Sequence, residues 1–160
     1  MAEWLRRGLQ ILLSQFDSGR GLQIKINMDK EILKIALNTK NYSFLKNHTH
    51  YTKMKNTTCG DEIKIYLIVK KGKILKLQYE GESCVYCQAS ASLLSDIIKN
   101  KNTLNISSLL IEAVKQFKYQ KNNYNKKEWK DFLKIMNKNN IQRKECLFLP
   151  IKATLKALRN

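Results

Sequence analysis

The sequence predicts an α+β fold in which a small antiparallel β-sheet packs against several helices. The first observation is a stretch of alternating apolar and polar residues, 61–81, with a glycine near its middle, which is typical of a β-hairpin. The second is that the segments on both sides of this stretch repeat apolar residues with a helical period. A sheet with one apolar face needs a second layer to cover it, so the helices are expected to pack on the hairpin.

The chain before the hairpin is predicted to contain one helix and one loop. Residues 28–40 carry Ile32, Ile35 and Ala36 at helical spacing. Residues 41–58 are polar and show neither a helical nor a strand period, so they are predicted to form a loop.

The hairpin is predicted to place its alternate apolar side chains on one face. Gly72 lies between the two strands and supplies the turn, where a residue without a Cβ atom is favoured. The positions assigned to the buried face are Ile63, Ile65, Leu67, Leu75, Leu77 and Tyr79. This face is expected to contact the helices.

Four helical segments are predicted after the hairpin. They cover residues 88–101, residues near 103–118 and 126–137, and residues 150–158. The core positions of the first are Leu93, Leu94, Ile97 and Ile98. Pro150, the only proline, is placed in the first turn of the last helix, where its missing N–H has no helical partner to lose.

The first 27 residues differ in composition from the rest, and the main domain is predicted to span residues 28–160. The first 23 contain three of the five arginines, three of the six glycines and no lysine. Their apolar spacing also permits an amphipathic helix or a targeting presequence, although acidic residues argue against the latter. Back-translation favours a third interpretation, because the codons can hold the D-arm, the T-loop and the terminal CCA of a transfer-RNA gene. We therefore expect a mistranslated or disordered extension.

The net charge of +17 at pH 7 raises the question of a nucleic-acid partner. Lysine supplies 25 of the 30 basic residues, and lysine, asparagine and isoleucine all have A/T-rich codons, so a biased genome produces the same excess. The lysines are scattered and form no stripe with arginine and aromatic residues, so we expect no specific nucleic-acid partner. No window reaches the roughly 18 apolar residues that a membrane span needs, so no membrane partner is expected.

Four cysteines, Cys59, Cys84, Cys87 and Cys146, are the candidates for chemistry. The chain shows no credible signal peptide, so a cytoplasmic, reducing location is expected, where clustered thiols indicate metal or sulfur chemistry before disulfides. Cys59 and Cys84 flank the two ends of the hairpin and are therefore expected to be neighbours in space. Asp61 is expected to point to the same side as Cys59 in an extended segment.

Cys87 and Cys146 are each predicted near the N-terminal end of a helix. The helix dipole there favours thiolate, the form that binds metal and attacks sulfur. Burial in the core is the ordinary alternative for a single cysteine, and a four-cysteine zinc site of ribbon type is another. A shared site is favoured because all four thiols lie at the ends of elements, and a ribbon usually shows two Cys-x-x-Cys pairs where this chain has one.

Three stretches resemble, in order and spacing, those that characterise the IscU/SufU/NifU N-terminal family of iron–sulfur cluster assembly scaffolds. They are CGDEIKIYLIV from residue 59, CVYCQASASLLSD from residue 84 and RKECLFLPIKATLKAL from residue 143. The resemblance covers roughly residues 28–160 and implies an α+β fold of the NifU-N/SufE-like type.

The resemblance also implies a set of site residues. Cys59, Cys84 and Cys146 match the three ligand cysteines of the family, and Asp61 matches the aspartate associated with cluster lability or zinc ligation. Arg143 matches the arginine of the SufU-like branch, which the long interval between Cys84 and Cys146 also favours. Cys59 and Cys146 are the implied acceptors of persulfide sulfur.

The chain departs from the family pattern in several places. Glu145 replaces the histidine that precedes the last cysteine in the IscU branch, and we expect it to be a solvated neighbour of the site. Cys87 is additional to the three-cysteine set, and three roles stay open for it: a fourth ligand, a resolving thiol or a small buried residue. His48 and His50, in the predicted loop, are expected to be solvated.

The resemblance implies two alternative functions. In the first, a scaffold receives sulfur from a cysteine desulfurase, binds iron and builds a transient 2Fe–2S cluster on Cys59, Asp61, Cys84 and Cys146. It then transfers the cluster to apo iron–sulfur proteins or carriers, and the weak oxygen ligand helps release. In the second, the same residues hold Zn²⁺ in a SufU-type sulfur carrier. A non-enzymatic scaffold is favoured over a sulfurtransferase, and a basic nucleic-acid-binding module with structural zinc is the third alternative.

Overall fold

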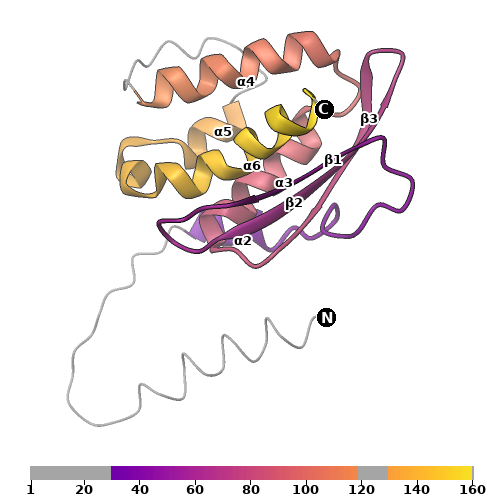
Figure 1. The fold of residues 1–160 in the computed structure, drawn as a ribbon. Coiled ribbons are helices and arrows are strands. Elements are labelled where there is room, and N and C mark those ends of the chain that lie inside the picture. The colour runs from indigo at the N-terminus through magenta and orange to yellow at the C-terminus, as the bar shows by residue number, and fades with distance from the viewer. Residues whose placement is uncertain (1–29, 119–129, 160) are drawn as a thin grey trace, which may run out of the picture.

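The computed structural model describes residues 30–118 and 130–159. Within these ranges the elements follow in the order α2 (Lys30–Ala36), β1 (His50–Lys55), β2 (Glu62–Lys70), β3 (Lys73–Glu80), α3 (Val85–Ile97), α4 (Thr103–Lys118), α5 (Lys130–Ile135), the 3₁₀ helix η2 (Lys138–Arg143) and α6 (Lys144–Ala157). The predicted N-terminal extension and the start of the predicted helix 126–137 lie outside the described residues. Figure 1 shows a small sheet with helices gathered on one side of it, which confirms the predicted α+β fold.

The sheet contains three antiparallel strands in the order β1-β2-β3. The prediction of a loop over residues 41–58 is wrong for residues 50–55, because β1 pairs along β2 from His50 opposite Leu67 to Lys55 opposite Glu62. Only Thr52 is buried among the six residues of β1. An edge strand with one buried side chain carries no apolar alternation, so pairing with β2 determines its conformation.

The predicted hairpin is confirmed as β2 and β3, with one correction in its register. Leu75 was assigned to the buried face, but its side chain is 38% exposed, whereas Ile74 is buried. The pairing shifts between Ile68 and Val69, which face Lys76 and Ile74 respectively. Leu75 is therefore the extra residue of a β-bulge, and a bulge reverses the inside–outside pattern at that point.

Helices α3 and α6 cover the inner face of the sheet, and both begin earlier than predicted. The placement of Pro150 in a first turn is wrong, because it lies buried inside α6. Proline has no N–H, so it cannot donate the helical hydrogen bond to the Cys146 carbonyl. Ser90 on α3 donates a hydrogen bond of 2.7 Å to the carbonyl of Leu147 in the same part of α6. This bond joins α3 to α6 one residue after Cys146, which falls in the first turn of α6.

The other described helices pack on this central pair. α2 lies against α3 through the fully buried Ile32, and α4 packs on α6. Phe117 of α4 meets Phe148 of α6 edge to face, with ring centroids 5.6 Å apart. One continuous core therefore joins the sheet to α3, α6 and α4.

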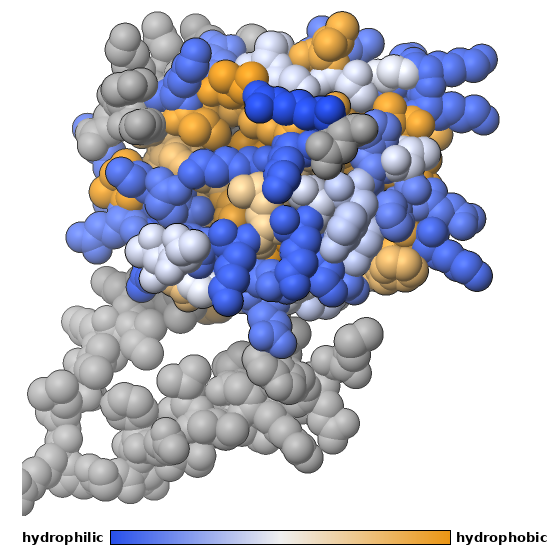
Figure 2. All heavy atoms as spheres, in the orientation of Figure 1, coloured by the Kyte–Doolittle hydropathy of each residue, from blue (hydrophilic) through white to orange (hydrophobic). Residues whose placement is uncertain are grey.

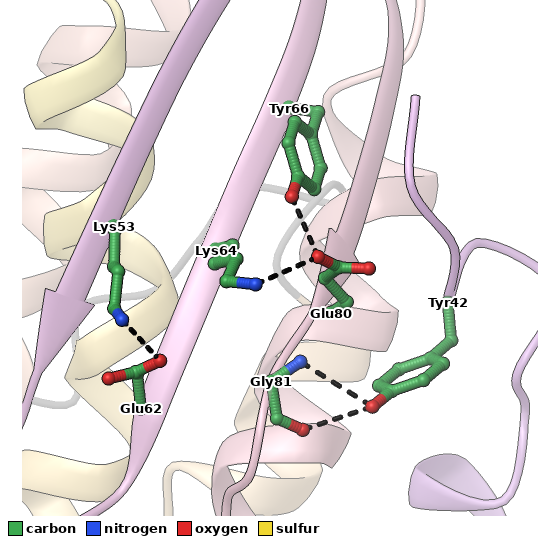
Figure 3. A network of polar contacts seen from close by, with 7 residues as sticks. All are labelled: Tyr42, Lys53, Glu62, Lys64, Tyr66, Glu80 and Gly81. Carbon is green, nitrogen blue, oxygen red and sulfur yellow. Dashed lines mark hydrogen bonds and ion pairs between the residues drawn. The ribbon is translucent and has the colours of Figure 1, made fainter. Parts of the chain in front are cut away.

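The outer face of the sheet carries polar and charged contacts beside the ring of Tyr66, which packs against other aromatic side chains. Lys64 Nζ and Tyr66 Oη both donate to the same oxygen of Glu80, at 3.1 and 2.8 Å (Figure 3). Lys53 pairs with Glu62 at 2.8 Å across the neighbouring strands (Figure 3). The molecular face drawn in Figure 2 is mostly hydrophilic, with hydrophobic side chains between the charged ones. No helix of the described ranges is both long enough and apolar enough to cross a membrane.

Candidate metal and sulfur site

Cys59 and Asp61 lie in the tight turn between β1 and β2. The N–H of Asn56 donates to the carbonyl of Asp61 at 2.7 Å, and the N–H of Gly60 donates to the carbonyl of Asn56 at 2.8 Å. Gly60 adopts a φ of 79°, a left-handed conformation that favours glycine. Cys59 and Asp61 therefore come together because the chain turns between them, and the extended segment expected from the sequence is not present.

Cys146 approaches this turn from the first turn of α6. Its thiol lies 3.6 Å from the sulfur of Cys59. The ligand atoms of Cys59, Asp61 and Cys146 all lie within 4.8 Å of one another. Two segments far apart in the sequence thus bring two thiols and one carboxylate together.

Cys84 completes the rim of the site as the N-cap residue of α3. Its N–H donates to Asp61 Oδ1 at 2.9 Å, which fixes the start of α3 to the β1–β2 turn. The side chain of Cys84 also lies beside Asp61 and Cys146, although its sulfur is not one of the three mutually close ligand atoms. The prediction that Cys59 and Cys84 lie at the same end of the hairpin is consistent with these contacts.

Gly81 allows the close approach of the chain that carries Cys84. It has a φ of 152°, and a Cβ atom at this position would lie 2.1 Å from the carbonyl oxygen of Glu62. The hydroxyl of Tyr42 donates to the Gly81 carbonyl at 3.0 Å (Figure 3). Next to it, the N–H of Glu62 donates to the carbonyl of Glu82 at 2.8 Å. These contacts hold the exit of β3 against the entrance of β2.

Asp61 has the features of a ligand. The residue is 7% exposed, and its second carboxylate oxygen, Oδ2, is buried without a hydrogen-bond partner among the described residues. A buried carboxylate oxygen without a partner is costly unless a cation or donor meets it. Zinc–sulfur bonds of about 2.3 Å in a tetrahedron place two sulfurs about 3.8 Å apart, close to the separation of Cys59 and Cys146. The donor set therefore fits zinc or iron.

Burial outweighs the helix dipoles at the thiols. Burial raises the pKa of Cys84, and the Asp61 carboxylate raises it further, while the N–H of Cys87 acts in the opposite direction. Burial also raises the pKa of Cys146, and the neighbouring sulfur of Cys84 adds to this effect. Burial likewise raises the pKa of Cys87, so the expectation that the helix dipole would favour thiolates at Cys87 and Cys146 is not met. A metal ion held by Cys59, Asp61, Cys84 and Cys146 would supply the positive charge that favours thiolates, because metal ligation deprotonates a thiol.

Cys87 lies in the hydrophobic core beside the site, close to Cys84. It is fully buried in the first turn of α3, within the hydrophobic core. It is not part of the group of mutually close ligand atoms that Cys59, Asp61 and Cys146 form.

Arg143 and Glu145 flank Cys146 without pointing at the thiols. The Arg143 guanidinium lies 5.8 Å from the ring centroid of Tyr86, in the first turn of α3. It therefore links the start of α6 to the start of α3 through a cation–π contact. Glu145 forms an exposed ion pair of 2.7 Å with Lys152, which agrees with its expected place beside the site.

The two histidines lie at the other end of β2. His50 pairs with Leu67, and its ring nitrogen Nδ1 is 2.8 Å from the hydroxyl of Thr49. His48 packs its ring between Phe44, Tyr51 and Tyr66. The half-buried rings are therefore less solvated than expected, and they do not join the ligand group of Cys59, Asp61 and Cys146.

Comparison with known proteins agrees with this geometry. Residues 27–142 match the model of the NifU-like N-terminal domain. A Thermotoga maritima protein described as the iron–sulfur cluster assembly scaffold protein IscU is 33% identical over 136 residues, which cover 84% of this chain and 94% of that protein. The zinc-dependent sulfurtransferase SufU of Bacillus subtilis is 37% identical over 49 residues, covering 31% of this chain and 33% of that protein.

The fold has solved counterparts as well. A crystal structure from Fervidobacterium islandicum, described as an iron–sulfur cluster assembly scaffold protein for the SUF system, superposes with a TM-score of 0.72 at 24% identity. It covers 81% of this chain and 94% of that chain. The match to the domain model and the Thermotoga relative together decide the family. The chain belongs to the NifU-like N-terminal domain family.

Proposed function

We propose that this protein is a scaffold on which iron–sulfur clusters are assembled and from which they are released. The observation that carries the proposal is the convergence of Cys59, Asp61 and Cys146 at one point, with Cys84 beside them. Thiolates are the ligands that iron–sulfur clusters require. The carboxylate of the set is a harder ligand than a thiolate and binds a soft iron–sulfide cluster less tightly. A weakly bound ligand suits a protein that must release its cluster.

The four residues take different roles in this proposal. Cys59 is exposed at the tip of the β1–β2 turn, so it can receive persulfide sulfur from another protein. Cys146, 3.6 Å away, can accept that sulfur by thiol exchange. Iron is held by Cys59, Asp61, Cys84 and Cys146 while a 2Fe–2S cluster forms as cargo. Arg143 positions the α6 start against α3 through Tyr86.

A zinc-dependent sulfur carrier is the second candidate function. The 3.6 Å separation of the Cys59 and Cys146 sulfurs suits a tetrahedral zinc ion as well as it suits iron. In that case Cys59, Asp61, Cys84 and Cys146 hold zinc, and one thiol leaves the metal to carry sulfur. The similarity to the B. subtilis sulfurtransferase supports this alternative over a shorter stretch of the chain.

The partners follow from the chemistry of both candidates. A cysteine desulfurase is the proposed sulfur donor, and apo iron–sulfur proteins or cluster carriers are the proposed acceptors. A reducing, cytoplasmic location suits four free thiols. The basic nucleic-acid-binding module stays the third candidate, and nothing in the arrangement of the cysteines favours it.

Metal and sulfide analysis of anaerobically purified protein tests the proposal. The scaffold function predicts iron and acid-labile sulfide in equal amounts, with visible absorbance from a cluster, after supply of iron and a sulfur donor. The carrier function predicts one zinc ion per chain and no labile sulfide. His50→Ala is the matched control, because His50 is a potential ligand that lies away from the site, and its metal content should equal that of the wild type. A protein that binds neither iron nor zinc contradicts both candidates.

A further inference from the structure

Cys84 and Cys87 form a pair at the start of α3 that the proposed ligand set uses only in part. Cys84 is the N-cap residue and Cys87 stands three positions later, in the first turn. Helix geometry places Cα atoms three residues apart at a distance of about 5 Å. This value lies inside the range of about 4.4–6.8 Å over which a disulfide closes without strain. The backbone therefore already has the geometry of a dithiol that can oxidise.

The two thiols differ in access. Cys84 is half-buried at the rim of the site, whereas Cys87 is fully buried beneath it. A sulfur donor from solvent can therefore contact Cys84 directly but not the buried Cys87. The first turn of α3, which carries both cysteines, is held in place by a hydrogen bond of 3.0 Å from the N–H of Gln88 to the Cys84 carbonyl. The Gln88 side chain donates to Ser83 at 2.9 Å.

A scaffold that receives persulfide sulfur also needs electrons. Persulfide sulfur arrives at the oxidation level of elemental sulfur, and the cluster contains sulfide, so each sulfur must gain two electrons. Two thiols that join as a disulfide release two electrons. The dithiol at the start of α3 has the right stoichiometry for this reduction, and it lies beside the ligands on which the cluster is built.

We propose that Cys84 and Cys87 reduce persulfide sulfur to sulfide within the site. This inference rests on the proposed function, because it assumes that sulfur arrives as persulfide. Sulfur bound to Cys146 or Cys59 passes to Cys84, whose side chain lies beside Cys146. The Cys87 sulfur then attacks Cys84 Sγ. The sulfur–sulfur bond of the persulfide breaks, HS⁻ leaves, and a Cys84–Cys87 disulfide forms.

The step balances in atoms and electrons. The proton of the Cys87 thiol is lost when the new bond forms and can leave with the sulfide as H₂S. The sulfane sulfur is the oxidant and gains two electrons, and the two cysteine sulfurs together lose two. A dithiol reductant of the thioredoxin class, or dithiothreitol in the test tube, returns the pair to thiols by exchange. Cys84 is then free to ligate iron.

The test uses full-length apo protein under anaerobic conditions with a metal chelator present. Glutathione persulfide is the sulfur donor, and no other reductant is added. Trypsin cleavage at lysines yields the peptide 77–99, which contains Cys84 and Cys87 and neither of the other two cysteines. We expect released sulfide and a peptide lighter by two hydrogen atoms, which marks the internal disulfide. The Cys87→Ser variant should retain an extra sulfur atom on this peptide. It should release sulfide at roughly one tenth of the wild-type rate or below.

Two results overturn the inference. One is a wild-type peptide that keeps the persulfide without forming the internal disulfide. The other is a disulfide that joins Cys84 to Cys146 or Cys59 instead. Both are read from the wild type, so poor folding of Cys87→Ser leaves the test intact. The metal and sulfide analysis above does not depend on this exchange, so a failed dithiol with normal metal content rejects this inference alone. Loss of metal binding with a working dithiol rejects the scaffold instead.

Discussion

The sulfurs of Cys59 and Cys146 lie 3.6 Å apart, although 87 positions separate the two residues in the sequence. Cys59 stands in the β1–β2 turn and Cys146 in the first turn of α6, which packs across both strands. The helix–sheet packing that forms the core therefore also assembles the site.

The cysteines at the site should act as one unit. Replacing Cys59, Cys84 or Cys146 singly by serine should reduce bound iron or zinc roughly tenfold or more, because the remaining ligands lose both a bond and the geometry. Metal content per chain after anaerobic reconstitution measures this. Cys87→Ser is the matched control and should retain metal. Full metal content in all three single variants would show that the thiols do not share a site.

The contact between α3 and α6 should depend on Ser90. Ser90→Ala leaves the Leu147 carbonyl buried without the 2.7 Å hydrogen bond, so the free energy of unfolding should fall by about 1–3 kcal/mol. Thr154→Val is the matched control in α6, because the Thr154 hydroxyl is buried without a partner among the described residues. Urea unfolding of the apo proteins should show a lower free energy of unfolding for Ser90→Ala. For Thr154→Val the free energy of unfolding should change little or rise. Equal losses would contradict this view of the α3–α6 contact.

Much of the fold could be predicted from local pattern, and the exceptions have physical causes. Alternation identified β2 and β3 because their inner face is fully buried against helices. β1 could not be predicted because a polar edge strand with Thr52 as its one buried residue has no such pattern. The exposure of Leu75 follows from a bulge that alternation does not reveal.

The site was predictable to a different degree. The hairpin placed Cys59 near Cys84 from topology alone, whereas the arrival of Cys146 depends on α6 packing across the sheet. Pro150 predicts a helix start, whereas α6 begins at Lys144 and continues through the proline. The sequence does not predict the raised pKa of Cys146 either. A helix N-terminus can be identified from a sequence, whereas the burial of the thiol, which raises its pKa, depends on tertiary packing.

Gly81 should tolerate no side chain. A Cβ atom there would lie 2.1 Å from the Glu62 carbonyl oxygen, so Gly81→Ala should separate the ends of β2 and β3. We expect a loss of about 1–3 kcal/mol in the free energy of unfolding. Gly60→Ala is the comparison, because its Cβ atom meets open space and only the backbone strain at a φ of 79° remains, about 1 kcal/mol. Thermal unfolding of both apo variants measures the difference, and a smaller loss for Gly81→Ala would contradict the close approach.

The apo protein should lose stability at alkaline pH through Tyr79. Burial raises the pKa of Tyr79 from its ordinary value of 10.0 to about 12. Because the folded state has the higher pKa, the contribution of Tyr79 to the free energy of unfolding is complete below pH 10. It is lost as the pH rises toward 12. Unfolding free energies measured from pH 9 to 12 should fall less steeply for Tyr79→Phe than for the wild type. The exposed Tyr51→Phe should follow the wild type, and parallel curves for all three proteins would count against a buried hydroxyl.

Transfer of a reconstituted cluster to an apo-ferredoxin tests the proposed scaffold function. Asp61→Ala and Asp61→Asn are compared with the wild type. Asparagine keeps an oxygen for the 2.9 Å hydrogen bond from the Cys84 N–H, so it should preserve stability, whereas alanine should cost about 0.5–2 kcal/mol. Both variants lose the anionic ligand, so both should transfer the cluster more slowly than the wild type and hold it longer in air. Wild-type protein that forms no transferable cluster, or transfer traces identical for all three proteins, would contradict the account.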